Sequence, residues 1–167
     1  MKKSILLLLT LGLAFSSFPQ NKSSKYLLDV GEIEHLFFMP KFSFAQNYIL
    51  AHDYTFTGSS SGGMYYEFES NASKGKTLIR FRCFNESIME IQIFTDDIEF
   101  INRLKGSPSK FGYENAKIVF PAPKAGDAVW IKERNFLGKN LYFSLSCSVI
   151  TETGKTSFSF FAELRNL

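Results

Sequence analysis

The sequence predicts an α+β protein, with an antiparallel sheet of about seven or eight strands and one or two helices packed on one face. Apolar residues recur at every second position through much of the chain, as in strands that have one buried face. Two segments, residues 29–38 and 96–106, instead have apolar residues three and four apart, which is typical of helices. Strands and helices do not alternate in the βαβ pattern that builds a parallel sheet.

The first twenty residues have the anatomy of a secretory signal peptide. Lys2 and Lys3 precede an apolar run over residues 5–15, and small residues follow it. The run is too short to span a bilayer comfortably. A buried N-terminal helix is the alternative, but it leaves the adjacent lysines unexplained. We expect residues 1–20 to be removed and residues 21–167 to form a single α+β domain, exported to the periplasm or the exterior.

The composition of the chain limits the classes of partner that we expect the protein to bind. The chain has 19 basic and 16 acidic residues, and loss of Lys2 and Lys3 leaves 17 minus 16, or +1. The remaining basic residues are scattered among acidic ones, so nucleic acid is not an expected partner. No second apolar run is long enough to form an integral membrane segment after signal cleavage. The first cysteine is Cys83, so no lipid-modified cysteine is expected at the mature N-terminus.

The N-terminal half is expected to hold one helix and four strands. The helix over residues 29–38 places Val30, Ile33 and Phe37 on one side and stops before Pro40. Residues 46–57 are predicted as the first strand, and the Gly/Ser segment 58–63 as a flexible loop. Three further alternating segments follow, with these predicted inward residues: Met64, Tyr66 and Phe68; Ile79, Phe81 and Cys83; Met89, Ile91 and Ile93.

The second helix has the clearest end signals in the sequence. Asp96 and Glu99 stand three apart as a variant of the capping box, and Gly106 occupies the position of a C-terminal cap. The predicted apolar stripe consists of Ile98, Ile101 and Leu104. This pattern predicts a helix that packs its stripe against the sheet.

The C-terminal part is predicted to be all strand. Segments 116–120 and 128–132 come first, with prolines between them. A hairpin then turns around Thr153 and Gly154, and its two strands alternate bulky apolar residues with serines. Such alternation indicates a sheet with one face in water.

Cys83 and Cys147 both fall on the apolar faces of predicted strands. In an oxidising compartment they could form a disulfide across 147 − 83 = 64 residues. Two buried free thiols are the alternative, since spacing does not show distance. With no CxxC spacing and two histidines in the whole chain, no metal site is predicted.

No catalytic residue and no cofactor is predicted. Residues 58–62 match G-x-S-x-G around Ser60, but a nucleophile elbow needs a helix after the serine, and an alternating segment follows here. His52 and Asp53 are adjacent, so on the predicted strand they point to opposite faces. Neither would then orient the other for acid–base work.

These observations favour an exported, non-catalytic binding domain for a protein partner or a small-molecule ligand. An inhibitor or immunity-type protein would fit this description. The predicted contact residues are Tyr65, Tyr142 and Phe136, because aromatic side chains beside loops offer large contact areas. A small secreted hydrolase is one alternative, and would need His52 to converge with a serine or carboxylate. A structural component of a surface assembly is another, and would need an unpaired edge strand or self-association.

Overall fold

The chain folds into one antiparallel sheet of eight strands with helices against it, which confirms the α+β prediction. The computed structural model describes residues 27–72, 75–115, 128–136, 139–150 and 153–165. The proposed signal peptide and the predicted strand 116–120 lie outside these residues. The strands lie in the order β1-β2-β3-β4-β8-β7-β6-β5. Their bounds are Thr55–Ser60 (β1), Tyr65–Ala72 (β2), Gly75–Phe84 (β3), Ser87–Thr95 (β4), Glu114–Asn115 (β5), Ala128–Phe136 (β6), Lys139–Val149 (β7) and Thr156–Arg165 (β8).

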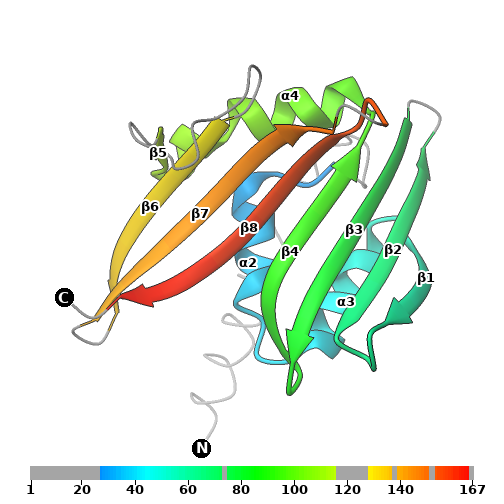
Figure 1. Cartoon of the computed structure of the whole chain (residues 1–167), viewed down its shortest axis with the longest axis horizontal. Coiled ribbons are helices and arrows are strands. Elements are labelled where there is room, and N and C mark those ends of the chain that lie inside the picture. The colour runs from blue at the N-terminus through cyan, green and yellow to red at the C-terminus, as the bar shows by residue number, and fades with distance from the viewer. Residues whose placement is uncertain (1–26, 73–74, 116–127, 137–138, 151–152, 166–167) are drawn as a thin grey trace, which may run out of the picture.

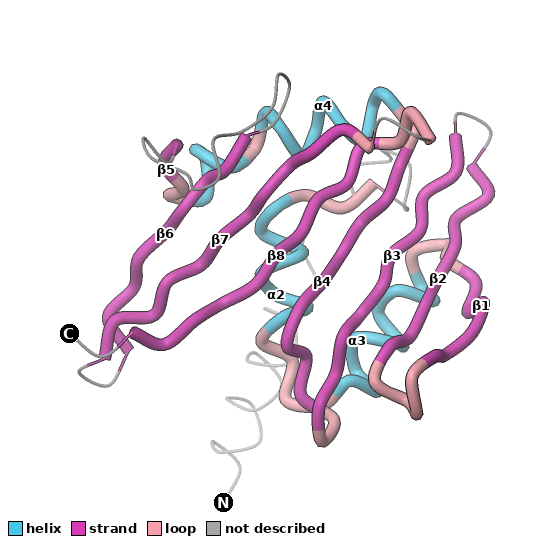
Figure 2. Tube along the Cα trace, in the orientation of Figure 1, coloured by secondary structure: helices cyan, strands magenta, loops and turns pink. Residues whose placement is uncertain are grey.

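Three α-helices are described, rather than the one or two predicted: α2 (Val30–Phe37), α3 (Phe42–Ala51) and α4 (Ile98–Gly106). A short 3-10 helix, η1 (Pro108–Phe111), follows α4. Helices α2 and α3 both lie behind the same face of the sheet, and α4 runs along the end where β4 and β7 finish (Figure 1). Figure 2 shows the opposite face of the sheet with no described helix in front of it.

Helix α3 occupies the segment that the sequence predicts as a strand. The prediction of a strand over 46–57 is wrong for most of its length, and β1 instead begins at Thr55 and continues into the Gly/Ser segment. Phe42, Ala45 and Ile49 are spaced at helical intervals and are all buried. The Phe42 ring stacks on Tyr66 at 4.2 Å between centroids. Burial of this stripe outweighs the β propensity of the aromatic and β-branched residues around it.

The core lies between the sheet and helices α2 and α3. Every second residue of the central strands points inward, as the alternation predicts. The inward residues that are almost completely buried include Phe68, Ile79, Phe81, Ile91, Ile93, Phe143, Leu145, Phe158 and Phe160. The phenylalanine-rich composition therefore builds one continuous core under the strands.

The cap and the buried stripe of α4 differ from the prediction. Asp97, not Asp96, is the N-cap, and its carboxylate accepts hydrogen bonds from the backbone N–H groups of Glu99 (2.9 Å) and Phe100 (3.2 Å). Phe100 and Leu104 are the buried residues of the helix, while Ile98 is exposed. Ile98 lies two residues before Phe100, about 200° around the helix, so it faces away from the side that Phe100 and Leu104 bury.

The first inward residue of β4 differs from the prediction because of a β-bulge. The register between β3 and β4 shifts between Arg82 and Cys83, so Ile88 rather than Met89 faces Cys83 and is buried. Met89 is exposed as a consequence. The turn before it is formed by Asn85 and Glu86 as predicted, and both have positive φ angles (47° and 63°), as in the type I′ turns of tight hairpins.

The predicted disulfide between Cys83 and Cys147 is wrong, because neither cysteine is in a disulfide and both are buried. Across the sheet, Cys147 pairs with Phe158, Phe158 with Ile93, and Ile93 with Ile79 on β3. Cys83 thus lies three strand spacings from Cys147 and four residues along β3, which corresponds to roughly 19 Å. A disulfide requires Cα atoms within about 7 Å.

We therefore expect thiol titration of unreduced, unfolded protein to find both cysteines reactive. In the folded protein they should react slowly, because both are buried and burial raises the pKa of the Cys83 thiol to about 11. Ellman's reagent with and without denaturant measures both quantities. Absence of free thiol in the unreduced, unfolded protein would contradict this arrangement.

Candidate binding surface

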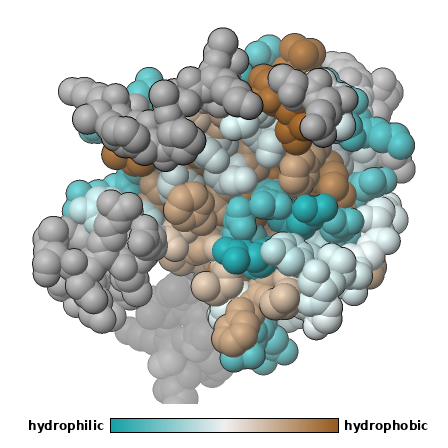
Figure 3. All heavy atoms as spheres, viewed as in Figure 1, coloured by the Kyte–Doolittle hydropathy of each residue, from teal (hydrophilic) through white to brown (hydrophobic). Residues whose placement is uncertain are grey.

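The candidate binding surface is the face of the sheet opposite the helices, where aromatic, charged and serine side chains point outward. We call it the open face; it consists of the outward side chains of β2, β3, β4, β8, β7 and β6. One cross-strand row illustrates its composition, running through Tyr65, Arg82, Glu90, Phe161 and Ser144. Figure 3 shows pale and teal residues mixed with tan ones across the middle of this face, rather than one continuous apolar patch.

Small hydroxyl side chains form the centre of the open face. On β7 and β8 the register pairs Ser146 with Ser159 and Ser148 with Ser157. Strands on either side carry longer outward side chains, including Phe94 on β4 and Ile131 on β6. The centre of the face is therefore a shallow floor of serines between larger side chains.

Two ion pairs lie on the β2–β4 side of the open face. Arg80 contacts Glu67 at 2.7 Å, and Nε of Arg82 contacts Glu90 at 3.2 Å. The Arg80 guanidinium also lies 5.3 Å from the centre of the Phe94 ring. Each arginine faces a carboxylate, so the two pairs add no net charge to the open face.

The structure places two of the three predicted contact residues on this face. Tyr65 and Tyr142 are both half-buried and both outward, four strand spacings apart, which corresponds to about 20 Å. Phe136 is the last residue of β6, and its side chain lies outside the described part of the structure. The sequence analysis missed Phe161, which is 40% exposed in the same row as Tyr65. Alternation within β8 was the available signal, since Phe158 and Phe160 are buried and Phe161 therefore points outward.

The residues considered for catalysis do not converge. His52 caps the C-terminus of α3, and Asp53 follows with a φ of 63°. The prediction that both residues lie on a strand is therefore wrong. Ser60 ends β1, and a turn and β2 follow it, so the strand–turn–helix arrangement of a nucleophile elbow is not formed. His52 precedes β1 and Ser60 ends it, which separates them by roughly 20 Å of extended chain.

Both histidines instead lie beside Tyr48, between α2 and α3. The His52 ring stacks on Tyr48 at 4.2 Å, and His35 meets the same ring edge-on at 6.1 Å. Tyr48 donates a hydrogen bond to Glu32 (3.2 Å). Burial, and then the nearby charges of Glu32 and Asp29, raise the pKa of Tyr48 well above its usual range. Tyr48 therefore remains a hydrogen-bond donor that links the helices, rather than a catalytic base.

A second ionic cluster is buried under the other half of the sheet. Glu34 of α2 accepts hydrogen bonds from Nζ of Lys132 on β6 (2.7 and 3.0 Å) and from the hydroxyl of Tyr113 (3.3 Å). Arg134 approaches the same carboxylate at 3.2 Å. Burial, and then the charge of Glu34, raise the pKa of Tyr113 well above its usual range. Lys132 and Glu34 are each about 90% buried, so the cluster joins α2 to β6 and is closed to a ligand.

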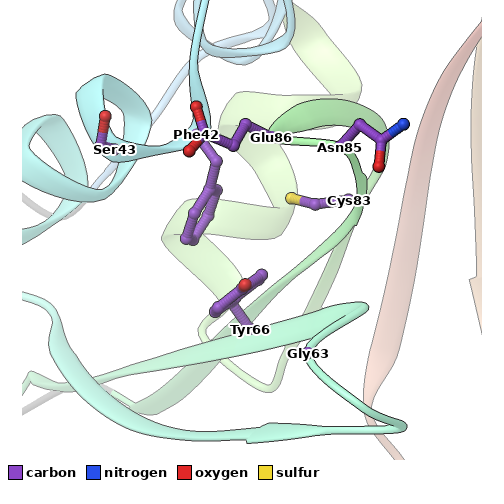
Figure 4. A pocket seen from close by; sticks show the side chains of 7 residues that line it. All are labelled: Phe42, Ser43, Gly63, Tyr66, Cys83, Asn85 and Glu86. Carbon is purple, nitrogen blue, oxygen red and sulfur yellow. The ribbon is translucent and has the colours of Figure 1, made fainter.

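The two described hollows lie away from the open face. One of about 160 Å³ lies between the start of α3 and the β3–β4 turn, where the thiol of Cys83 points toward the Phe42 ring (Figure 4). The other, of about 340 Å³, lies between the N-cap residue of α2, Asp29, and residues of α4 and η1, including Arg103 and Phe111. Small-molecule sites commonly enclose about 300–1,000 Å³, so the first is too small for most ligands.

Comparison with known proteins finds no match to a family model, a curated protein or a solved structure. Within the described residues, no group of three or more His, Cys, Asp or Glu side chains is arranged to hold a metal ion. None of the described helices is long and apolar enough to cross a membrane. The chemistry of this protein must therefore be judged from its own surfaces.

Proposed function

We propose that this chain is an exported, non-catalytic binding domain that recognises a protein partner through its open face. The observation that carries the proposal is the serine floor with outward aromatic side chains around it, namely Tyr65, Phe161 and Tyr142. Tyrosine and serine together are typical of surfaces that bind proteins, since rigid rings supply contact area and small hydroxyls adapt their hydrogen bonds.

A protein partner fits this face better than a small ligand does. The outward serines of β7 and β8 are short and lie side by side, so the centre of the face offers breadth rather than depth. The separation of Ser60 from His52 favours binding over hydrolysis. Such a face matches the role of an inhibitor or immunity-type protein, which covers a surface of an exported enzyme or toxin; the partner is then that enzyme or toxin.

We expect Tyr65→Ala and Tyr142→Ala to leave the protein folded and to weaken partner binding by about tenfold or more each. The test captures proteins of the same compartment on the immobilised wild type, and then measures the affinity of the captured partner for each variant. Phe44→Ala is the matched control, because Phe44 is an exposed aromatic residue on α3, behind the sheet.

Two outcomes would contradict the proposal. One is a partner that binds both tyrosine variants as tightly as the wild type. The other is a measurable turnover that Ser60→Ala or His52→Ala abolishes while the domain stays folded. Circular dichroism of each variant separates loss of binding from loss of fold.

A further inference from the structure

Strand β1 forms one edge of the sheet, at the right of Figure 1, and lacks two features that often protect an edge, charged side chains and proline. Among the described residues it pairs only with β2. Its six residues, Thr55–Ser60, contain no charged residue and no proline, and five of the six are exposed. Such an edge presents unpaired backbone N–H and C=O groups to another strand. The opposite edge, β5, has two residues and exposes Glu114.

The chain around this edge is depleted of charge. Residues 42–64 include α3, β1 and the following turn, and Asp53 is the only Asp, Glu, Lys or Arg among these 23 residues. The chain average of 21% charged residues would give about five in a segment of this length. Loss of charged residues together with gain of aromatic ones is the compositional signature of the core of a protein interface.

Two exposed apolar side chains flank the edge. Phe56 of β1 is 43% exposed although its ring contacts Phe68 at 5.4 Å on the helix side of the sheet. Leu50 of α3 is 42% exposed. It lies two residues after Tyr48, which faces α2, so helical geometry turns it about 200° away from α2, toward the β1 side. Figure 2 shows α3 between α2 and this edge.

We propose that the β1 edge is a homodimer interface, in which β1 pairs antiparallel with β1 of a second copy of this chain. A two-fold axis perpendicular to the sheet keeps the helices of both copies on one side. The Leu50 and Phe56 side chains of each copy then lie alongside those of the other. Because β1 carries no charge, pairing with itself places no like charges opposite each other.

A second copy fits this edge better than the β5 edge of a neighbouring molecule does. A β5-to-β1 contact would be heterologous and would build an open chain of molecules, whereas β1 with β1 closes as a dimer. Strand β5 is also too short to match the six residues of β1. The register of β1 shifts between Phe56 and Gly58, so regular backbone pairing is brief. Leu50 and Phe56 must therefore contribute much of the contact.

The test measures the mass of the purified protein by sedimentation over a wide range of concentrations. We expect a dimer for the wild type. Ser59→Lys and Phe56→Lys each place a charge at the interface, and should raise the dimer dissociation constant by about tenfold or more. Ser59 is exposed, so its replacement is compatible with the fold even if Phe56→Lys is not.

Ser109→Lys is the matched control, because it makes the same change at an exposed position of η1 and should leave the dimer intact. A wild type that remains a monomer at every concentration would overturn the proposal. So would a dimer that Ser59→Lys leaves unchanged, since the interface would then lie elsewhere. Neither result depends on the partner proposed for the open face.

Discussion

Replacement of Lys132 by alanine is expected to lower the free energy of unfolding by about 3 kcal/mol. The Glu34 carboxylate would lose the ammonium group that contacts both of its oxygens and would remain about 90% buried. Removal of one member of a buried ion pair leaves a charge without compensation, which costs far more than loss of an exposed pair. Arg134 stays in contact with Glu34 and limits the loss, which places the expected value at the lower end of the usual range.

Denaturant unfolding of the wild type and Lys132→Ala measures this difference. The control is Arg134→Ala, which removes a partner of the same carboxylate whose side chain is 57% exposed, and should cost about 1 kcal/mol or less. The pair Lys132→Met with Glu34→Leu should recover most of the lost stability, because no buried charge remains. Equal losses for Lys132→Ala and Arg134→Ala would show that the buried contact has no special role.

Phe42→Ala is expected to cost about 3–4 kcal/mol of unfolding free energy. The Phe42 ring stacks on Tyr66 and packs against Phe68 and Phe81, so its removal leaves a cavity where α3 meets the sheet. The same residue holds the start of α3 in place, since that helix lacks a side-chain N-cap. Helix α3 should be the first element to lose protection from hydrogen exchange in the variant.

Phe44→Ala on the same helix is the control. Phe44 is 54% exposed, and its replacement should change the unfolding free energy by roughly 0.5 kcal/mol or less. Thermal and denaturant unfolding of both variants provide the comparison. If the two variants were equally stable, α3 would not be docked through Phe42.

Periodicity predicts the strands well where each has one buried and one wet face. The alternation of Ile79, Phe81 and Cys83 with arginines reports the inward side of β3 correctly, because side-chain direction in a strand is a local property. Helix α4 is also predictable from local sequence, since its cap, charges and apolar residues lie within eleven residues. The choice between Asp96 and Asp97 as the N-cap residue is not decided locally. That choice depends on the backbone N–H of Lys76, which binds Asp96 at 2.8 Å and leaves Asp97 to cap the helix.

Helix α3 shows where local patterns fail. Its residues have mixed propensity, and no side chain caps its start, so the sequence carries no strong helix signal. What stabilises the helix is contact with residues distant in the chain. The N–H of Phe42 donates to the carbonyl of Glu86 (2.8 Å), and its ring rests on β2 and β3.

The candidate surface was only partly predictable for the same reason. The outward positions of Tyr65 and Tyr142 follow from alternation in their own strands, but their membership of one surface depends on the strand order. Phe161 joins Tyr65 in a row because β8 inserts between β4 and β7. The sheet places β4 beside β8 rather than beside β5, the next strand along the chain. Such a strand order depends on contacts between distant segments, and the pattern within one segment carries no information about them.

Local sequence patterns predict the α+β class, most strands and their inward sides, and the helices α2 and α4, because propensity, capping and periodicity act within a few residues. The order of the strands, the helical state of α3 and the separation of Cys83 from Cys147 depend instead on tertiary contacts. The tertiary structure also brings Glu34 to Lys132, 98 residues apart in the chain. These features depend on which buried surfaces meet, and the free energy of that contact is a property of the whole fold rather than of any segment.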